Sequence, residues 1–376
     1  MSQGQLSLRE ANRQLNIEEF QGRQIELQSL PLALFIELTQ NCNLKCAYCR
    51  SAGTYNPEWD MPIDLFRRVA EELFPTATMV DLRGWGESTV LKSFSEFISI
   101  TTDYGPLIRL VTNGMNPNEA IWDQLMAAHA TVVVSCDTAD ADLFATLRTG
   151  GKLSRLVQTV QTMVRYRDHY RVPRDNVYFT AVVSRPNVEH LSALVEMAHE
   201  LDIPKVILFP VGIDPTHPWH LRHDIDLTRS SLIKAHERAD QLSVTLQLAA
   251  ALDDALRLPD DVRTMCMHPW AYALVDYLGR VGYCDLLLSR AEHTFGSLHE
   301  KSFQVIWNGN DFQELRSAHV QRMLPDRFSP CRWCHKMRYV DFEHLIHPSY
   351  ASKVVSNQTR IQLYENGIPL EPVPVF

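Results

Sequence analysis

A chain of 376 residues is long enough for about two domains, and its 45% apolar and 22% charged residues exclude a disordered protein. Its 36 Lys and Arg residues against 45 Asp and Glu residues give a net charge of -9, so we expect no general affinity for nucleic acids or anionic membranes. No apolar run approaches the roughly 18 residues of a membrane span, and residues 1–14 lack the apolar core of a signal peptide. We therefore expect a cytoplasmic protein whose eight cysteines stay reduced.

Residues 31–210 alternate short apolar runs with amphipathic helical patterns. The expected strands are 32–38, 78–84, 107–112, 131–137, 177–183 and 205–210. The first helix begins with Pro62, and a later one begins at Asn187, a residue type that often caps helices. Such alternation is typical of a parallel sheet with right-handed crossovers, and six units are too few for a closed eight-stranded barrel. We predict an α/β fold, a partial (β/α)6 barrel over residues 31–225, with its site at the carboxyl ends of the strands.

The remaining segments have weaker patterns. We expect residues 1–30 to form an N-terminal extension and residues 226–262 to form a connecting helix and strand. A second domain over residues 263–340 contains a hairpin-like stretch at 271–284 and a helix pattern at 302–320. Residues 341–376 are expected to form a C-terminal tail.

Seven of the eight cysteines fall into two groups. The first group, Cys42, Cys46 and Cys49, directly follows the first expected strand, and the second contains Cys266, Cys284, Cys331 and Cys334. Three clustered thiolates can hold three irons of a cubane cluster and leave the fourth iron open. Four cysteines that end in C-x-x-C are also common zinc ligands, so zinc remains an alternative for the second group. Cys136 lies alone in an apolar run, where strand alternation directs it toward the helices as a packing residue.

The loop that carries the first group reads TQNCNLKCAYC over residues 39–49. It resembles the signature of the radical S-adenosylmethionine (SAM) enzymes, and the resemblance covers about residues 30–215. The resemblance implies that Cys42, Cys46 and Cys49 bind a [4Fe–4S] cluster and that its open iron binds the amino and carboxylate groups of SAM. The aromatic Tyr48 before the third cysteine is part of the same motif.

Short motifs at the ends of later strands are similar to SAM-binding segments of that family. They read GWGE at 84–87, TNG at 112–114 and SCD at 135–137. In the family, the first type of segment binds the SAM amino group and the third contacts the methionyl and ribose parts, while Arg148 matches a position that often faces the SAM carboxylate. The residues that the resemblance assigns to SAM binding are Tyr48, Gly84, Gly86, Glu87, Thr112, Asn113, Ser135, Asp137 and Arg148.

The second cysteine group is similar to the C-terminal extension called SPASM. Its spacing is C-x12-G-x4-C, followed by a helix pattern and C-x-x-C, and no cysteine follows Cys334 in the printed sequence. The full SPASM pattern carries further cysteines, so the match is better to its shortened form, the twitch domain. This resemblance implies one auxiliary [4Fe–4S] cluster, held by Cys266, Cys284, Cys331 and Cys334, with a role in electron transfer.

The resemblance also implies a reaction. SAM is cleaved reductively to a 5′-deoxyadenosyl radical, which takes a hydrogen atom from the substrate, and a reduced flavodoxin or ferredoxin supplies the electron. Twitch-bearing relatives include dehydrogenases of aminocyclitols and amino sugars, so we expect an oxidoreductase that oxidises a small polar, sugar-like substrate, with the auxiliary cluster as electron acceptor. The alternatives are a peptide-modifying maturase, a sugar epimerase and a non-catalytic zinc-binding interaction protein.

Two further expectations bear on the substrate. Only about 30 residues precede the first strand, too few for the peptide-recognition domain of many crosslinking members. The sequence assigns no catalytic base. The side chains within reach in principle are Asp81, Arg83, Thr180, His217, His220 and His223.

Overall fold

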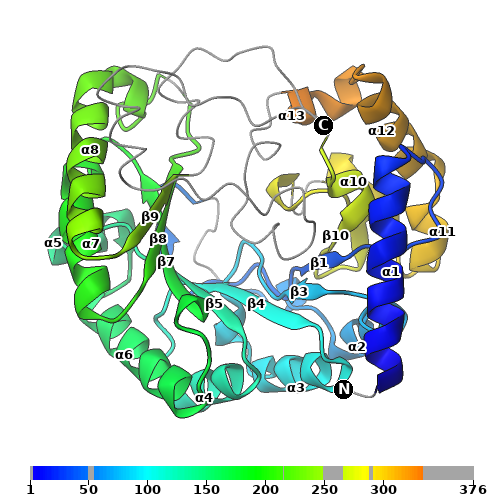
Figure 1. Ribbon diagram of the computed structural model, residues 1–376, viewed down its shortest axis with the longest axis horizontal. Coiled ribbons are helices and arrows are strands. Elements are labelled where there is room, and N and C mark those ends of the chain that lie inside the picture. Colours follow the sequence, from blue (N-terminus) through cyan, green and yellow to red (C-terminus); the bar gives the residue numbers. More distant parts are fainter. Residues whose placement is uncertain (1–2, 50–54, 215, 249–265, 288–290, 333–376) are drawn as a thin grey trace.

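The computed structural model describes residues 3–49, 55–214, 216–248, 266–287 and 291–332. In these residues one sheet of ten strands runs through the molecule in the order β12-β11-β10-β1-β3-β4-β5-β7-β8-β9 (Figure 1). Its parallel part contains β1 (Ala33–Ile36), β3 (Met79–Asp81), β4 (Leu107–Thr112), β5 (Thr131–Ser135), β7 (Val177–Val183), β8 (Lys205–Pro210), β9 (Thr245–Leu248) and β10 (Tyr272–Val275). The antiparallel end contains β11 (Arg280–Gly282) and β12 (Thr294–Ser297).

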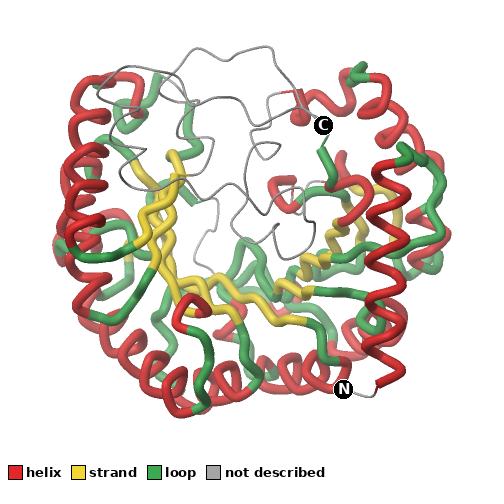
Figure 2. The backbone as a smooth tube through the Cα atoms, viewed as in Figure 1, coloured by secondary structure: helices red, strands yellow, loops and turns green. Residues whose placement is uncertain are grey.

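Helices cover the outer side of the curved sheet, as Figure 2 shows in red around the yellow strands. They are α2 (Ile63–Leu73), α3 (Phe94–Tyr104), α4 (Glu119–Ala127), α5 (Ala141–Leu147), α6 (Leu153–His169), α7 (Leu191–Glu200) and α8 (Ile225–Gln241). The six predicted strands are all present, and the predicted partial (β/α)6 barrel is confirmed. β9, from the segment expected to be a connection, adds a further parallel strand beside β8.

Helix α2 illustrates how the sequence produces these elements. Pro62 lies at its N-cap in an extended conformation, and the helix buries a stripe of five apolar side chains against the sheet, Leu65, Phe66, Val69, Ala70 and Leu73. The ring of Phe66 meets Phe97 of α3 edge to face at 4.8 Å. Burial of each of the four larger side chains contributes roughly 1.5–3 kcal/mol, so the stripe holds α2 in place.

The C-terminal part continues the barrel sheet. β10 pairs in parallel with β1, from Ala33 opposite Tyr272 to Ile36 opposite Val275. The expected hairpin is present as β10 and β11, and its turn contains Gly279 at φ 74°, a left-handed conformation that suits glycine. The expected helix at 302–320 is two helices, α11 (Phe303–Trp307) and α12 (Asn310–Gln321). The break follows because the Asn308 side chain exchanges hydrogen bonds with the backbone of Leu27.

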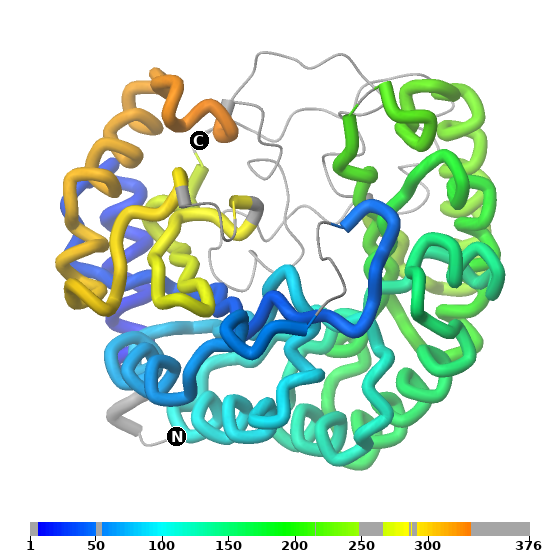
Figure 3. The backbone as a smooth tube through the Cα atoms, turned by 180° about the vertical axis from the view of Figure 1, so that it is seen from behind, coloured from blue at the N-terminus to red at the C-terminus, as the bar shows by residue number. Residues whose placement is uncertain are grey.

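The N-terminal helix α1 (Gln3–Gln21) spans both parts of the sheet. Arg9 donates to the carbonyls of Phe74 and Ala77 behind α2, and Asn16 donates to the carbonyl of Trp270 in α10 (His268–Ala271). Figure 3 shows this blue helix alongside the yellow and orange C-terminal part. The residues expected to form an extension are therefore an integral layer of the fold.

Candidate functional site

The loop with the first three cysteines begins where β1 leaves the sheet. Two of its side chains converge on Asp60, whose Oδ1 accepts the Thr39 hydroxyl at 2.5 Å and the Asn41 amide at 2.6 Å. The Asn41 side chain also accepts the backbone N–H of Asn56 at 2.7 Å. Asp60 was not expected in the site, because a lone aspartate beyond the motif gives no signal of this contact. The start of the cysteine loop is thereby fixed to the segment that precedes α2.

The middle of the loop is fixed by a small second sheet. β2 (Lys45–Cys46) pairs with β6 (Arg148–Thr149), and Cys46 lies opposite Arg148. The N–H of Ala47 donates to the carbonyl of Leu147 at 2.9 Å. This pairing places the guanidinium that the resemblance assigned to SAM beside the second cysteine of the motif.

The three thiols fit a polynuclear cluster better than a single ion. Cys42, Cys46 and Cys49 are half-buried, and burial, with neighbouring charges including the other thiols, raises the pKa of Cys42 to about 11. A metal would stabilise the thiolates that this environment disfavours. In the described part of the chain, these sulfurs form no group whose ligand atoms all lie within 4.8 Å, a spacing that a tetrahedral zinc with bonds of about 2.3 Å requires. The donor set therefore suits iron–sulfur chemistry with an open position.

Glu87 joins the loops that follow β3 and β4. Its buried carboxylate accepts the backbone N–H of Asn113 at 2.6 Å and the hydroxyls of Thr112 at 2.8 Å and Thr89 at 2.6 Å. Burial raises the pKa of Glu87, and these hydrogen bonds oppose that rise. The carboxylate that the resemblance assigned to the SAM amino group is thus already engaged by two other residues of the expected site.

The two glycines of the GWGE segment pack against the end of β1. A Cβ on Gly84 would lie 2.5 Å from Cγ of Glu37, and a Cβ on Gly86 would lie 2.4 Å from the carbonyl oxygen of Asn41. The N–H of Gly86 donates to the Thr39 carbonyl at 3.2 Å. Glycine is therefore required here because the cysteine loop itself approaches so closely, a contact that the sequence motif does not reveal.

Asn113 reaches the first cysteine from the end of β4. Its Nδ2 lies 3.8 Å from Sγ of Cys42 and donates to Oδ1 of Asn43 at 2.7 Å. The structure thus brings together the TNG segment, the GWGE segment and the cysteine loop, as the expected site requires.

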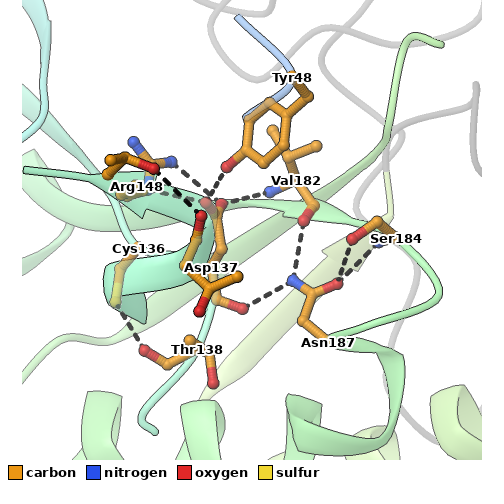
Figure 4. Close-up of polar contacts among 10 residues, drawn as sticks. Tyr48, Cys136, Asp137, Thr138, Arg148, Val182, Ser184 and Asn187 are labelled. Carbon is orange, nitrogen blue, oxygen red and sulfur yellow. Dashed lines mark hydrogen bonds and ion pairs between the residues drawn. The ribbon is translucent and has the colours of Figure 1, made fainter. Parts of the chain in front are cut away.

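Asp137, after β5, is the centre of a buried polar network (Figure 4). Its carboxylate forms an ion pair with Arg148, whose Nε lies 2.7 Å from Oδ2 and whose Nη2 donates to Oδ1 at 3.0 Å. It also accepts the hydroxyl of Tyr48 and the N–H of Val182, the latter at 2.8 Å. Burial alone lowers the pKa of an arginine, but the Asp137 charge holds the pKa of Arg148 well above its ordinary value. Three predicted site residues from three separate segments therefore form one charged network, with both carboxylate oxygens occupied.

Asn187 completes this network and was not expected in the site. Its Nδ2 donates to the backbone carbonyl of Asp137 at 2.8 Å and to that of Val182 at 2.9 Å, and its Oδ1 accepts the N–H of Ser184 at 2.7 Å (Figure 4). The sequence suggested a helix cap, and Asn187 does precede a short 3₁₀ turn, but its side chain makes no cap hydrogen bond. The sequence signal for its role in the site was its position, since Asn187 is a polar residue that follows β7.

The other strand-end residues separate into accessible and buried ones. Ser135, the last residue of β5, is half-buried and lies opposite Thr180 of β7. Cys136 is fully buried in the core, which confirms its packing role. Asp81 is also fully buried and pairs with Arg109 and Arg83, so it is closed to a substrate as a base.

The histidines proposed as bases lie in a loop after β8. His217 and His223 are exposed and His220 is half-buried. The ring nitrogens of His217 and His220 each accept a backbone N–H two residues further along their own loop, at 3.1 Å. These contacts organise the loop and leave the catalytic base unassigned.

The second cysteine group is partly described. Cys266, Cys284 and Cys331 are half-buried, and Cys334 lies outside the described residues. Burial raises the pKa of Tyr283, and the neighbouring Cys331 and Cys284 raise it further. Ligand atoms of His268, Cys284 and Asp285 lie within 4.8 Å of one another. Two cysteines of the group and additional potential metal ligands therefore meet near β11.

Comparison with known proteins defines the class. A sequence model of the radical SAM superfamily matches residues 36–228, and one described as the iron–sulfur cluster-binding domain SPASM matches residues 266–335. The chain therefore belongs to the radical SAM superfamily, in its SPASM-containing subgroup. Membership implies a SAM-binding [4Fe–4S] cluster and auxiliary iron–sulfur binding, and it excludes the non-catalytic zinc protein. No helix among the described residues is both long and apolar enough to span a membrane.

Individual relatives are distant. The chain is 21% identical over 306 residues to the tungsten-containing aldehyde ferredoxin oxidoreductase cofactor-modifying protein of Pyrococcus furiosus, covering 78% of this chain and 85% of that protein. It is 26% identical over 307 residues to the PqqA peptide cyclase of Xanthomonas campestris, covering 77% and 76%. The crystal structure of Streptococcus suis SuiB bound to the precursor peptide SuiA aligns with a TM-score of 0.61 at 16% identity, covering 82% of this chain and 71% of that chain, which shows a shared fold.

Proposed function

We propose that this radical SAM enzyme is a maturase that modifies a peptide, the alternative to the sugar-like substrate that the cysteine pattern first suggested. The observation that carries the proposal is the similarity to the PqqA peptide cyclase, which extends over more than three quarters of each chain. The dehydrogenase expectation relied on the twitch-like cysteine count and on the short stretch of residues before the first strand. The twitch form itself stays a prediction, because Cys334 lies outside the described residues.

We assign Cys42, Cys46 and Cys49 to the cluster that binds SAM, which when bound would supply the electron for cleavage of the SAM sulfonium bond. Glu87 and Asp137 each accept at least three hydrogen bonds from their own chain, so we assign them to holding the site loops in place. The groups assigned to face SAM are the backbone of residues 84–86, the Asn113 amide and the Ser135 hydroxyl.

The fixed loops would do two things for the reaction. They orient SAM relative to the cysteines, since Arg148 and Asn113 are both held beside the cysteine loop. They also limit reorganisation at the carboxyl ends of the strands, where a peptide side chain would enter. Precise positioning matters because a carbon radical reacts with whatever C–H bond lies nearest.

We assign Cys266, Cys284, Cys331 and Cys334 to an auxiliary [4Fe–4S] cluster that takes an electron from the substrate radical. A reduced flavodoxin or ferredoxin is the proposed electron donor. We propose a cytoplasmic location, where cysteines that would bind iron stay reduced.

The test is an anaerobic assay of the reconstituted full chain with SAM and reductant. Short peptides encoded beside the gene form one substrate set, and aminocyclitols and amino sugars form the other. We expect 5′-deoxyadenosine to rise with one peptide and that peptide to lose two hydrogens in mass spectrometry. The Cys46→Ala variant is the control and should form no 5′-deoxyadenosine.

One observation favours a second candidate, oxidation of a small polar alcohol. None of the 42 residues printed after Cys334 is a cysteine, so the sequence offers four cysteines for auxiliary iron where a full SPASM pattern has more. The same assay separates the two functions. Stimulation of 5′-deoxyadenosine by an aminocyclitol or amino sugar, with no response to any peptide, would replace the first proposal by the second.

A further inference from the structure

Four charged side chains form a continuous chain from the barrel interior to the second cysteine group. Arg109 of β4 contacts Oδ2 of Asp81 in β3 at 2.6 Å, and Nε of Arg83 contacts the same oxygen at 3.1 Å. Nη2 of Arg83 then contacts Oδ2 of Asp285 at 2.7 Å. Arg83 is thus shared between one carboxylate of the barrel and one of the C-terminal part.

This chain of charges is shielded from solvent. The Asp81 side chain is 0% exposed, Arg109 4%, Asp285 11% and Arg83 25%. The Arg83 guanidinium also lies 5.0 Å from the centre of the Phe35 ring, which restricts its movement. In such surroundings the effective dielectric constant is lower than in water, and a single charge acts more strongly on its neighbours.

Asp285 links this series of ion pairs to Cys284. Its Oδ1 lies 3.8 Å from Sγ of Cys284. A carboxylate at that distance stabilises the more positive, oxidised state of a cluster bound through this sulfur. Reduction potentials of iron–sulfur clusters respond to nearby net charge, so Asp285 alone would lower the potential. The positive charge of Arg83 opposes this effect.

We propose that Arg83 is a positioning residue that raises the reduction potential of the auxiliary cluster by pairing with Asp285. The proposal rests on the assignment of Cys284 as a cluster ligand under the proposed function, and it is independent of the substrate. It gives Arg83 a role distinct from the catalytic base considered for it in the sequence. A cluster with a higher potential is the better acceptor for an electron from a substrate radical.

The experiment is a redox titration of the auxiliary cluster followed by electron paramagnetic resonance. The full chain carries Cys42→Ala, Cys46→Ala and Cys49→Ala, so that the second group holds the iron that is titrated. We expect Arg83→Gln to shift the midpoint to lower potential, Asp285→Asn to shift it to higher potential, and Arg83→Lys to stay near the parent. Arg165→Gln removes one positive charge from an exposed pair on α6 and should leave the midpoint unchanged.

Three results would overturn the proposal. An unchanged midpoint in Arg83→Gln with full iron content shows that Arg83 does not tune the cluster, and loss of iron in Asp285→Asn shows that Asp285 is itself a ligand. If Arg83→Gln loses iron, Arg83→Lys must assemble the cluster at the parent potential, or the charge role is wrong. A parent that binds no iron at the second group contradicts the cluster assignment instead, and failure of the peptide assay leaves the titration intact.

Discussion

Cys46 and Arg148 face each other across β2 and β6, so the second cysteine of the motif is paired with the residue that neutralises Asp137. The contact joins the cysteine loop, residues 39–49, to the end of α5, the helix after β5. It explains why a buried carboxylate is tolerated at the centre of the site, because its charge is matched and both oxygens are hydrogen-bonded.

Replacing Arg148 by methionine should destabilise the protein strongly. The variant leaves the Asp137 carboxylate, 1% exposed, without its guanidinium, and breaking a buried pair in this way costs about 3–5 kcal/mol. Chemical denaturation of the cluster-free protein measures the loss. Arg165→Met, in a pair with 60% and 57% exposed side chains, should cost less than about 1 kcal/mol, and an equal loss in the two variants would contradict the network.

Gly86→Ala should disturb assembly of the first cluster. The added methyl group would lie 2.4 Å from the Asn41 carbonyl oxygen and would displace the loop that leads into Cys42. We expect a loss of about 1–3 kcal/mol in stability and less iron per chain in a background without the second cysteine group. Gly212→Ala is the matched control, because no atom lies within 4 Å of its added methyl group. Wild-type iron content in Gly86→Ala would show that the loop adapts.

Acid should weaken the C-terminal part through His319 of α12. Burial, with the nearby His268 charge, lowers the pKa of His319 from 6.5 to about 4. The unfolded chain therefore binds a proton that the folded chain does not, and stability falls as the pH drops from about 6.5 toward 4. At pH 5 the cost is about 2 kcal/mol.

Urea unfolding at pH 7.5 and pH 5 checks this dependence. The wild type should lose about 2 kcal/mol more than His319→Gln over that range, whereas a variant of the exposed His199 should behave like the wild type. The same loss in His319→Gln as in the wild type would place the acid sensitivity elsewhere.

Cys136 offers a test of which thiols hold iron. Because its side chain is fully buried in the core and its Sγ lies 3.5 Å from the Thr138 carbonyl, Cys136→Ala should keep the iron content of the wild type. The small cavity should cost about 1 kcal/mol. Cys46→Ala should lose the iron of the first group, measured as iron and sulfide per chain. Iron loss in Cys136→Ala would contradict the assignment.

The strands were predictable because apolar, β-branched runs have a strong local pattern. β4, β7 and β8 match the expected residues, while β1, β3 and β5 are shorter than 32–38, 78–84 and 131–137. Glu37 directly follows β1, Gly84 lies three residues after the end of β3, and the two residues pack closely together in the site. Strand propensity does not predict where a strand ends because the site requires a different backbone conformation.

The contacts that define the site were less predictable. Arg148 and Asp137 were each expected to bind SAM, but the sequence gave no sign that they bind each other. Asn187 and Asp60 had no motif to mark them, since their partners lie far along the chain. Local spacing also could not reveal that β10 would join β1, because parallel pairing between distant segments depends on the tertiary fold.

The parallel pairing of β10 with β1 has a consequence for where the protein can be truncated. A polypeptide cut after residue 248 would leave Ala33–Ile36, four buried apolar residues, as an open edge strand. Such edges recruit strands from other molecules, so the isolated barrel should aggregate. The C-terminal part that contains β10 is thus required to protect the edge of the barrel sheet. A chimaera that joins this barrel to another protein must therefore keep β1 and β10 together.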